Sequence, residues 1–407
     1  MRISTAYSFD SSIDNLQKRQ TEMSQSQMQL TSGKKVNAAS DDPIAAARAE
    51  RALASISRDD ANQRSLDASR NVMQLSESSI GDAVSLLQTA RESMVAAGNG
   101  SYTDKERQAL ALKLKDIRAQ MLTIANRSDG SGGFVFGGQG SASPPFLDTT
   151  SGVQFVGQGG QVQAASSESL NLTVDGDQTW LKAKSGNGVY ETNPASTNTG
   201  TGWITAGSVT TPADVPYPAD PSITPPQYAV TFSVNAGVTT YSVTKDGGGT
   251  SLNNVPFQSG KAIVIDGMSF AITGQPADTD SFTLNQSTND LSVFDALDTA
   301  ITSLTSTNQN TGQIMQAVNK GLSNLDSVLG NVSAARSAVG ESLNRMDSIE
   351  GRISASKLAA ETERSNAEDL DMVSAISKFQ NQQTGYDAAL KSYAMVQKLS
   401  LFQYING

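Results

Sequence analysis

Apolar residues recur at every seventh position between residues 66 and 94. The series consists of Leu66, Met73, Ile80, Leu87 and Met94. The position three after each of them holds a small residue, namely Ser69, Ser76, Ala83, Ala90 and Ala97. A seven-residue repeat is typical of a helix that packs along another helix, and alternating large and small side chains allow a close approach. The pattern predicts a long helix with a close helical partner.

Two further segments have helical spacing and could supply partners. Thr103 and Glu106 have the spacing of a capping box, which predicts the start of a second helix. Its apolar positions are Leu110, Leu114, Ile117, Met121 and Ile124. The third segment carries Val318, Leu322, Leu325, Leu329, Val332, Val339, Leu343, Met346 and Ile353. We expect these segments to bury one another as an elongated antiparallel bundle. Arg336 and Glu350 interrupt the third series, and either contact another subunit or extend into solvent.

The two ends of the chain have the same spacing, but glutamines such as Gln20, Gln27 and Gln383 interrupt their apolar faces. The apolar positions are Ile13, Leu16, Met23 and Leu30 near the N-terminus and Ile376, Phe379, Tyr386, Leu390, Tyr393, Val396, Leu399 and Phe402 near the C-terminus. Most helical stability comes from tertiary packing, so an isolated pair with such a face is marginally stable. We therefore predict that these residues form an assembly interface with neighbouring copies.

The stretch NAASDDPIAAARAE, residues 37–50, interrupts the helical pattern near the N-terminus. Ser40, Asp41 and Asp42 have side chains that accept hydrogen bonds from the free N–H groups of a helix start. Pro43 suits the first helical position, where no N–H is needed. Asp41 and Asp42 could alternatively bind a metal, but the proline that follows favours capping. The sequence predicts a joint between two helices here.

The middle of the chain has a different composition and pattern. It holds eleven of the 12 prolines, both tryptophans and no arginine, and carries 12 acidic residues against 4 lysines. Alternating runs such as QYAVTFSV, TYSVTK, KAIVIDGMSFAI and DSFTLN are typical of strands. A disordered linker is the alternative, since ETNPASTNTGTG and PADVPYPADPSITPP would suit one. The alternation from Val230 to Leu284 favours a folded β domain.

These patterns together predict an α+β fold. Its elongated antiparallel helical bundle is formed by the N- and C-terminal arms, with one β-rich domain inserted between them. The predicted parts are residues 1–42 with 354–407 as terminal helices, 43–135 with 291–353 as a helical rod, and 136–290 as the inserted domain.

Composition excludes most catalytic chemistry. The chain has Cys 0 and His 0, which rules out disulfides, thiolate nucleophiles and histidine-dependent zinc sites or catalytic triads. The acid pairs Asp175 with Asp177 and Asp278 with Asp280 could bind calcium, but their settings are typical of turns. We therefore predict no enzyme activity, no catalytic residues, and no cofactor or metal site.

Charge and hydropathy limit the classes of partner that this chain is expected to bind. A formal charge of -10 argues against nucleic acid, because phosphate contact needs a basic face. No apolar run approaches the roughly 18 residues of a membrane span, and the N-terminus MRISTAYSFDSS lacks the apolar core of a cleavable signal. We expect no membrane contact.

Several stretches resemble the bacterial flagellin superfamily. They are LTSGKKVNAASDDPIAAARA at residues 30–49, MRIST at the start, GGFVFGGQGSASPPF at residues 132–146, and the closing LSLFQYING. Within the superfamily they are more similar to hook-associated junction proteins than to filament flagellins, which usually continue the Asp-Asp motif differently. The resemblance covers roughly the first 145 and last 115 residues, and says nothing specific about the β domain.

This resemblance implies a structural role without catalysis. Terminal helices would pair to line a tube, the β domain would lie outside, and the chain would polymerise as a short ring between hook and filament. Implied partners are copies of the chain, an adjacent hook-associated protein, flagellin and a cytoplasmic export chaperone. Secretion through the flagellar type III apparatus would place the chain outside the cell.

The resemblance also gives the joint a role, in which residues 31–39 connect an inner-tube helix to an outer rod. Asp42 with Pro43 would fix where the second helix begins, and Gly33 would let the two helices take different angles. Two alternatives stay open. One is a filament flagellin that polymerises without limit. The other is a glycan-binding or enzymatic module in the β domain, with Trp180 and Trp203 stacking on sugars.

Overall fold

The structure, a computed structural model, describes residues 5–163, 169–218 and 224–405. It divides into two compact units. One unit comprises residues up to Arg64 together with those from Ile349 onward, and the other comprises Ser65–Ser348. Helices α2 (Pro43–Ala97) and α6 (Thr311–Glu368) each contribute to both units. The first unit is therefore assembled from two distant parts of the sequence, whereas the second is one continuous stretch.

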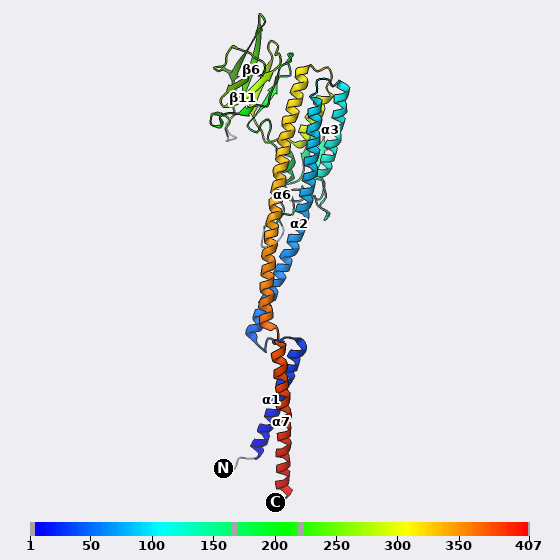
Figure 1. The fold of residues 1–407 in the computed structure, drawn as a ribbon, viewed down its shortest axis with the longest axis vertical. Helices are drawn as coiled ribbons and strands as arrows, with labels where there is room; N and C mark the ends of the chain where they lie inside the picture. The colour runs from blue at the N-terminus through cyan, green and yellow to red at the C-terminus, as the bar shows by residue number, and fades with distance from the viewer. Residues whose placement is uncertain (1–4, 164–168, 219–223, 406–407) are drawn as a thin grey trace. The chain divides into compact units, whose positions relative to one another are not determined.

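The unit that contains the chain ends is helical. Helix α1 (Thr5–Ser32) contacts α7 (Met372–Ile405), and Figure 1 shows these two helices side by side. The first part of α2 and the last part of α6 complete the unit, and an ion pair of 2.8 Å joins Asp60 to Lys357. Ala52, Ile353 and Ala360 are buried here.

The second unit contains a helical bundle built on the heptad series. The remainder of α2 and α6 lie with α3 (Asp104–Ala125) and α5 (Val293–Thr305), and α3 contacts α5. All five large residues of the heptad series are at most 1% exposed, and the five small residues between them are fully buried. Gly321 of α6 faces Met94 so closely that a Cβ atom would collide with its side chain. The predicted close helical partner is confirmed, and it is α6.

Local signals set the ends of the bundle helices. Thr103 and Glu106 form the predicted capping box at the start of α3, with the Thr103 N–H donating to Glu106 Oε2 at 2.6 Å. Ser292 caps α5 by accepting from two backbone N–H groups. Arg336 of α6 pairs with Glu77 of α2 at 2.6 Å, so it links two helices of the bundle. Neither of the two roles considered for Arg336 describes this contact.

The inserted region begins with a hairpin that packs on the bundle. Strands β1 (Phe146–Thr149) and β2 (Gly152–Phe155) are antiparallel. Arg118 of α3 pairs with Asp148 of β1 and with Asp298 of α5, each at 2.6 Å. The Arg118 guanidinium therefore links the hairpin to two helices of the bundle, and Asn126 at the end of α3 adds two hydrogen bonds to the backbone of Phe146.

Two antiparallel sheets form the β-rich domain, and Figure 1 shows β6 and β11 grouped beside the bundle helices. The first sheet has the order β3-β12-β6-β7-β8, with β9 paired to β7, and the second has the order β10-β11-β4, with β5 paired to β11. The strands are β3 (Tyr190–Pro194), β4 (Trp203–Ile204), β5 (Ser208–Val209), β6 (Tyr228–Asn235), β7 (Val238–Lys245), β8 (Gly248–Gly249), β9 (Val255–Pro256), β10 (Ala262–Ile265), β11 (Met268–Thr273) and β12 (Ser281–Gln286). Two short helical segments belong to the same region. Helix α4 (Gly176–Leu181) precedes β3, and the 3-10 helix η1 (Pro212–Asp214) lies between β5 and β6.

Both sheets contribute to one hydrophobic core. Tyr190, Tyr228 and Phe282 come from the first sheet, and Phe270 and Ile272 come from the second. Every alternating run that predicts a strand forms one, so the α+β fold with a β-rich insertion is confirmed. Strand β3 lies in the stretch that would suit a linker, while residues 219–223 of the other such stretch lie outside the described residues.

The C-terminal arm divides at a different place from the predicted domain boundary. Helix α6 runs without a break from Thr311 to Glu368, and α7 begins at Met372. Residues 354–368 therefore share a helix with residues 311–353. The functional division into three parts stays a prediction.

Candidate functional site

The joint in the N-terminal arm begins where α1 stops. Gly33 follows the last residue of α1 and takes a φ of 71°, a left-handed conformation that ends many helices. Its N–H donates to the Gln29 carbonyl at 2.9 Å, and no atom lies within 4 Å of where a Cβ would be. The backbone conformation, and not lack of space, is therefore the reason for glycine at this position.

The two aspartates before Pro43 do different things. Asp42 caps α2, because its Oδ1 accepts from the N–H groups of Ile44 and Ala45, both at 3.0 Å. Asp41 instead closes the preceding loop, because its Oδ2 accepts from the N–H groups of Asn37 and Ala38, both at 3.0 Å. Asp41 precedes the cap residue, and its carboxylate folds back over the loop rather than over the helix. The expectation that Asp41 caps α2 is wrong.

The C-terminal arm has a matching break that sequence patterns did not reveal. Helix α6 ends at Glu368 and α7 begins at Met372. Asp371 caps α7, and its Oδ1 accepts from the N–H groups of Val373 at 3.1 Å and Ser374 at 3.2 Å. An aspartate before a helical segment is the usual signal, but no proline or glycine follows or precedes it here to mark the break.

The two breaks are bonded to each other by the backbone. Lys34 and Asp369 form an isolated antiparallel bridge. The Lys35 N–H donates to the Glu368 carbonyl at 2.8 Å, and the Leu370 N–H donates to the Gly33 carbonyl at 2.9 Å. The segment after α1, residues 33–35, is therefore attached to the end of α6 and to the start of the connection to α7.

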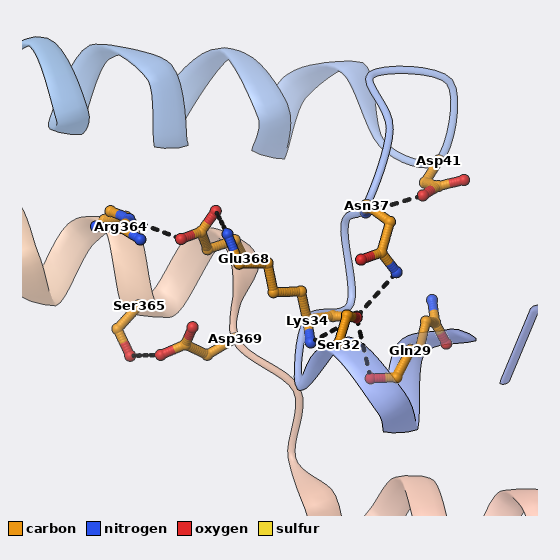
Figure 2. A network of polar contacts seen from close by, with 9 residues as sticks. All are labelled: Gln29, Ser32, Lys34, Asn37, Asp41, Arg364, Ser365, Glu368 and Asp369. Carbon is orange, nitrogen blue, oxygen red and sulfur yellow. Dashed lines mark hydrogen bonds and ion pairs between the residues drawn. The ribbon is translucent and has the colours of Figure 1, made fainter. Parts of the chain in front are cut away.

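Side chains strengthen this attachment, as Figure 2 shows. Lys34 Nζ lies 3.1 Å from Glu368 Oε2, and Arg364 Nε lies 2.6 Å from Glu368 Oε1. Lys35 Nζ donates to the Asn366 carbonyl at 2.6 Å, which is a carbonyl at the C-terminal end of α6. Cations at a helix C-terminus satisfy free carbonyls and interact favourably with the helix dipole. We call Lys34, Lys35, Glu368 and Leu370 with these bonds the clamp.

Glu368 is the most buried charge of the clamp, with 13% of its side chain exposed. Burial by itself raises the pKa of this carboxyl, but hydrogen bonds from Arg364 and Lys34 outweigh burial and lower the pKa below its ordinary value. The carboxylate is therefore ionised at neutral pH and holds two cations from different segments.

The predicted assembly residues lie on α1 and α7. Those that are half-buried are Ile13, Leu16, Met23, Leu30, Phe379, Tyr386 and Tyr393, while Ile376 and Leu390 are exposed. The side chains of Val396, Leu399 and Phe402 lie outside the described residues, although their backbone is part of α7. Pairing of the two helices therefore leaves apolar side chains accessible, among them Val373 at 82% exposed.

The carboxylates of the β domain serve local structure. Asp175 caps α4 by accepting from the Gln178 N–H, and Asp280 accepts from three backbone N–H groups. Asp278 accepts from the Val234 N–H at 2.9 Å. Among the described residues, no group of three or more acidic side chains could hold a metal ion. The acid pairs form turns and caps.

The two tryptophans differ in how accessible their side chains are. Trp180 is fully buried and makes an edge-to-face contact with Phe136, with ring centroids 5.1 Å apart. The hypothesis that Trp180 stacks on a glycan is therefore wrong, because stacking needs an accessible ring face. Trp203 is half-buried in β4.

In the part of the chain that the structure describes, none of the helices combines the length and the hydropathy needed to cross a bilayer.

Comparison with known families identifies the helical arms. Residues 3–141 match the bacterial flagellin N-terminal helical region, and residues 322–405 match the bacterial flagellin C-terminal helical region. The two matches together cover more than half of the 407 residues. The chain belongs to the bacterial flagellin family. The clamp lies within these two regions, because Lys34 and Lys35 fall in the first region and Glu368 and Leu370 fall in the second.

Individual relatives within the flagellin family are hook-associated proteins. Flagellar hook-associated protein 3 of Salmonella typhimurium is 34% identical over 160 residues, which is 37% of this chain and 48% of that protein. The protein of the same name from Escherichia coli is 28% identical over 199 residues, which is 47% of this chain and 57% of that protein. The matched stretches thus span about half the length of these relatives.

Solved structures extend the likeness to most of the fold. A flagellar hook associated protein-3 from Legionella pneumophila is 26% identical, with a TM-score of 0.69, and the match covers 77% of this chain and 96% of that one. The flagellar junction protein FlgL from Legionella pneumophila is 27% identical, with a TM-score of 0.64, and the match covers 71% of this chain and 95% of that one.

Proposed function

We propose that this chain is a structural subunit of the bacterial flagellum that forms the junction between hook and filament. The observation that carries the proposal is the terminal pair, α1 with α7, which leaves apolar side chains accessible. Both helices lie within the regions that match the bacterial flagellin terminal helical regions. Burying apolar surface yields roughly 25 cal/mol per Å². Copies packed through this pair would gain association free energy without any catalytic group.

The proposal assigns roles to the parts of the chain. Residues 1–42 with 354–407 line the inside of the assembly, residues 43–135 with 291–353 form the next layer, and residues 136–290 lie outside. The subunits contact copies of themselves, an adjacent hook-associated protein and flagellin. A cytoplasmic export chaperone covers the terminal helices before secretion, because exposed apolar helices would otherwise associate prematurely. The chain acts outside the cell and has no enzymatic activity.

Electron microscopy of the purified full chain tests this function. The protein is incubated alone under salting-out conditions, then with isolated hooks, and then with hooks followed by flagellin. A short cap that stops growing, and that flagellin requires for extension, is the expected result. Long filaments from the protein alone would make it a filament flagellin.

Matched variants test whether the terminal helices carry assembly. Ile376 on α7 is 45% exposed and Leu112 on α3 is 65% exposed, so neither side chain is needed for the core. Ile376→Asp is expected to abolish cap formation, because it places a charge in the proposed interface, whereas Leu112→Asp is expected to leave cap formation intact. Equal behaviour of the two variants would contradict an interface on α7.

A further inference from the structure

The helical arms are interrupted twice, between α1 and α2 and between α6 and α7, and different contacts hold the two breaks. We propose that the clamp joins them into one hinge, so that α1 and α7 turn together as one body about the C-terminal end of α6. Lys34 and Glu368 are the positioning residues of this hinge. Its use in assembly rests on the proposed function, whereas the clamp itself is a property of the isolated chain.

The first step is that α1 is attached to α6 independently of its covalent link to α2. Two backbone hydrogen bonds connect the segments, from Lys35 to Glu368 and from Leu370 to Gly33. The Lys34 to Glu368 ion pair and the Lys35 to Asn366 bond are added to them. Arg364 holds the Glu368 carboxylate from its own helix at 2.6 Å, which fixes the position that Lys34 must meet.

The second step is that the N-terminal connection is slack. Residues 36–42 link the clamp to α2, and their hydrogen bonds are local, from Asn37 and Ala38 to Asp41 and from Asn37 Nδ2 to the Lys34 carbonyl. Within the described ranges, no hydrogen bond or ion pair joins residues 36–42 to α6 or α7. This loop can change shape without breaking the clamp.

The third step is that the C-terminal connection is short and that its polar groups already form hydrogen bonds to Gly33 and to the start of α7. Residues 369–371 contain the Leu370 N–H that bonds Gly33 and the Asp371 carboxylate that caps α7. Helix α7 also contacts α1 along the terminal pair. Because α1 and α7 are held to each other and both are held at the end of α6, the pair can reorient only as a unit about that end.

Hydrogen exchange at single amides of the full chain tests the clamp. The amides of Lys35 and Leu370 report its two backbone bonds, and those of Asn37 and Ala38 report the slack loop. Glu368→Gln is expected to speed exchange at Lys35 and Leu370 together, by roughly two- to fivefold, because it weakens the ion pairs. The matched control Asp41→Asn is expected to speed Asn37 and Ala38 and leave the other two amides unchanged.

The coupling between the two amides is the decisive outcome. If Glu368→Gln alters only one of them, or neither, the two breaks are independent and the single hinge is wrong. This readout needs no hook, filament or partner. It therefore separates the clamp from the junction function, which can fail without affecting the exchange result.

A disulfide lock then tests whether the clamp stays closed during assembly. The chain has no cysteine of its own, and directly opposed residues of an antiparallel bridge lie within disulfide reach. In the variant Lys34→Cys with Asp369→Cys, the oxidised form is expected to cap isolated hooks at least as well as the reduced form, which lacks the ion pair. Caps formed only by the reduced form would mean that the clamp must open, and would overturn the single-hinge proposal.

Discussion

Asp42 and Asp371 cap the two helices that begin on either side of the joint, each through one carboxylate oxygen that accepts two backbone N–H groups. One aspartate is followed by proline and the other by methionine. The two arms of the chain thus use the same device at breaks that are joined by the Lys34 to Asp369 bridge. Capping, a local interaction, fixes where both helices start.

Removing the N-terminal cap should loosen the first turn of α2. Asp42→Ala is expected to cost about 1 kcal/mol locally, because two N–H groups lose their acceptor. Faster hydrogen exchange at Ile44 and Ala45 measures this cost. Asp41→Ala is the control, since its carboxylate bonds only loop amides, and an equal effect of both variants on Ile44 would contradict the assignment of the cap.

The clamp should weaken in acid. The pKa of Glu368 is lowered in the folded chain from the ordinary value of 4.5, so its stabilising contribution is present above about pH 4.5 and is lost as pH falls through the lower folded pKa. Exchange at Lys35 and Leu370, corrected for the intrinsic pH dependence of amide exchange, should rise relative to the rest of the chain in that range. In Glu368→Gln the same relative rise should be absent. A rise of equal size in the variant would assign the effect to other acids.

The heptad seam should dominate the stability of the bundle. Ile80 is fully buried, so Ile80→Ala is expected to lower the free energy of unfolding by about 2 to 5 kcal/mol through lost burial and a cavity. Leu112→Ala, at an exposed position of α3, is expected to change it by less than about 0.5 kcal/mol. Urea unfolding followed by circular dichroism compares the two, and similar midpoints would show that α2 does not pack through this seam.

A buried carboxylate should hold the β-rich domain together. Asp280 is 2% exposed and accepts from the N–H groups of Ala277, Thr199 and Gly200. Asp280→Asn replaces one acceptor oxygen by a donor, and is expected to destabilise the domain by about 1 to 3 kcal/mol because buried N–H groups lose their partner.

The neighbouring Asp278 provides the matched control for this change. It is exposed and accepts from one N–H group, so Asp278→Asn is expected to have a small effect. Thermal unfolding followed by the fluorescence of Trp203, in a Trp180→Phe background common to both variants and their parent, measures the difference. If calcium raised the midpoint of the parent but not of Asp280→Asn, the carboxylate would be a ligand and not a structural acceptor.

Sequence patterns predicted the parts of the fold whose signals are local or periodic. The heptad from Leu66 to Met94, the capping box at Thr103 and the alternating runs of the sheets all depend on neighbours close in sequence, and all are present. The short helix α4 was missed, because Gly176–Leu181 is too short to show a period.

The joint was predicted in one arm only. Proline marks the start of α2. In the other arm, no proline or glycine lies between the helical pattern that ends before Asp371 and the one that begins at Met372. The clamp could not be predicted, because Lys34 and Glu368 are far apart in sequence and no local pattern links them. Their sequence contexts are typical of exposed charges, and the two side chains pair only because the fold brings the ends of α1 and α6 together.

The unequal lengths of the two connections at the joint have a mechanical consequence. A fully extended chain spans about 3.4 Å per residue, so residues 36–42 can reach about 24 Å and residues 369–371 about 10 Å. Under tension along the terminal pair, the shorter connection becomes fully extended first. The load then passes from α7 into α6, while the longer connection of residues 36–42 can still extend. The C-terminal arm is then the tether of the terminal helices, and the N-terminal arm is the one that yields.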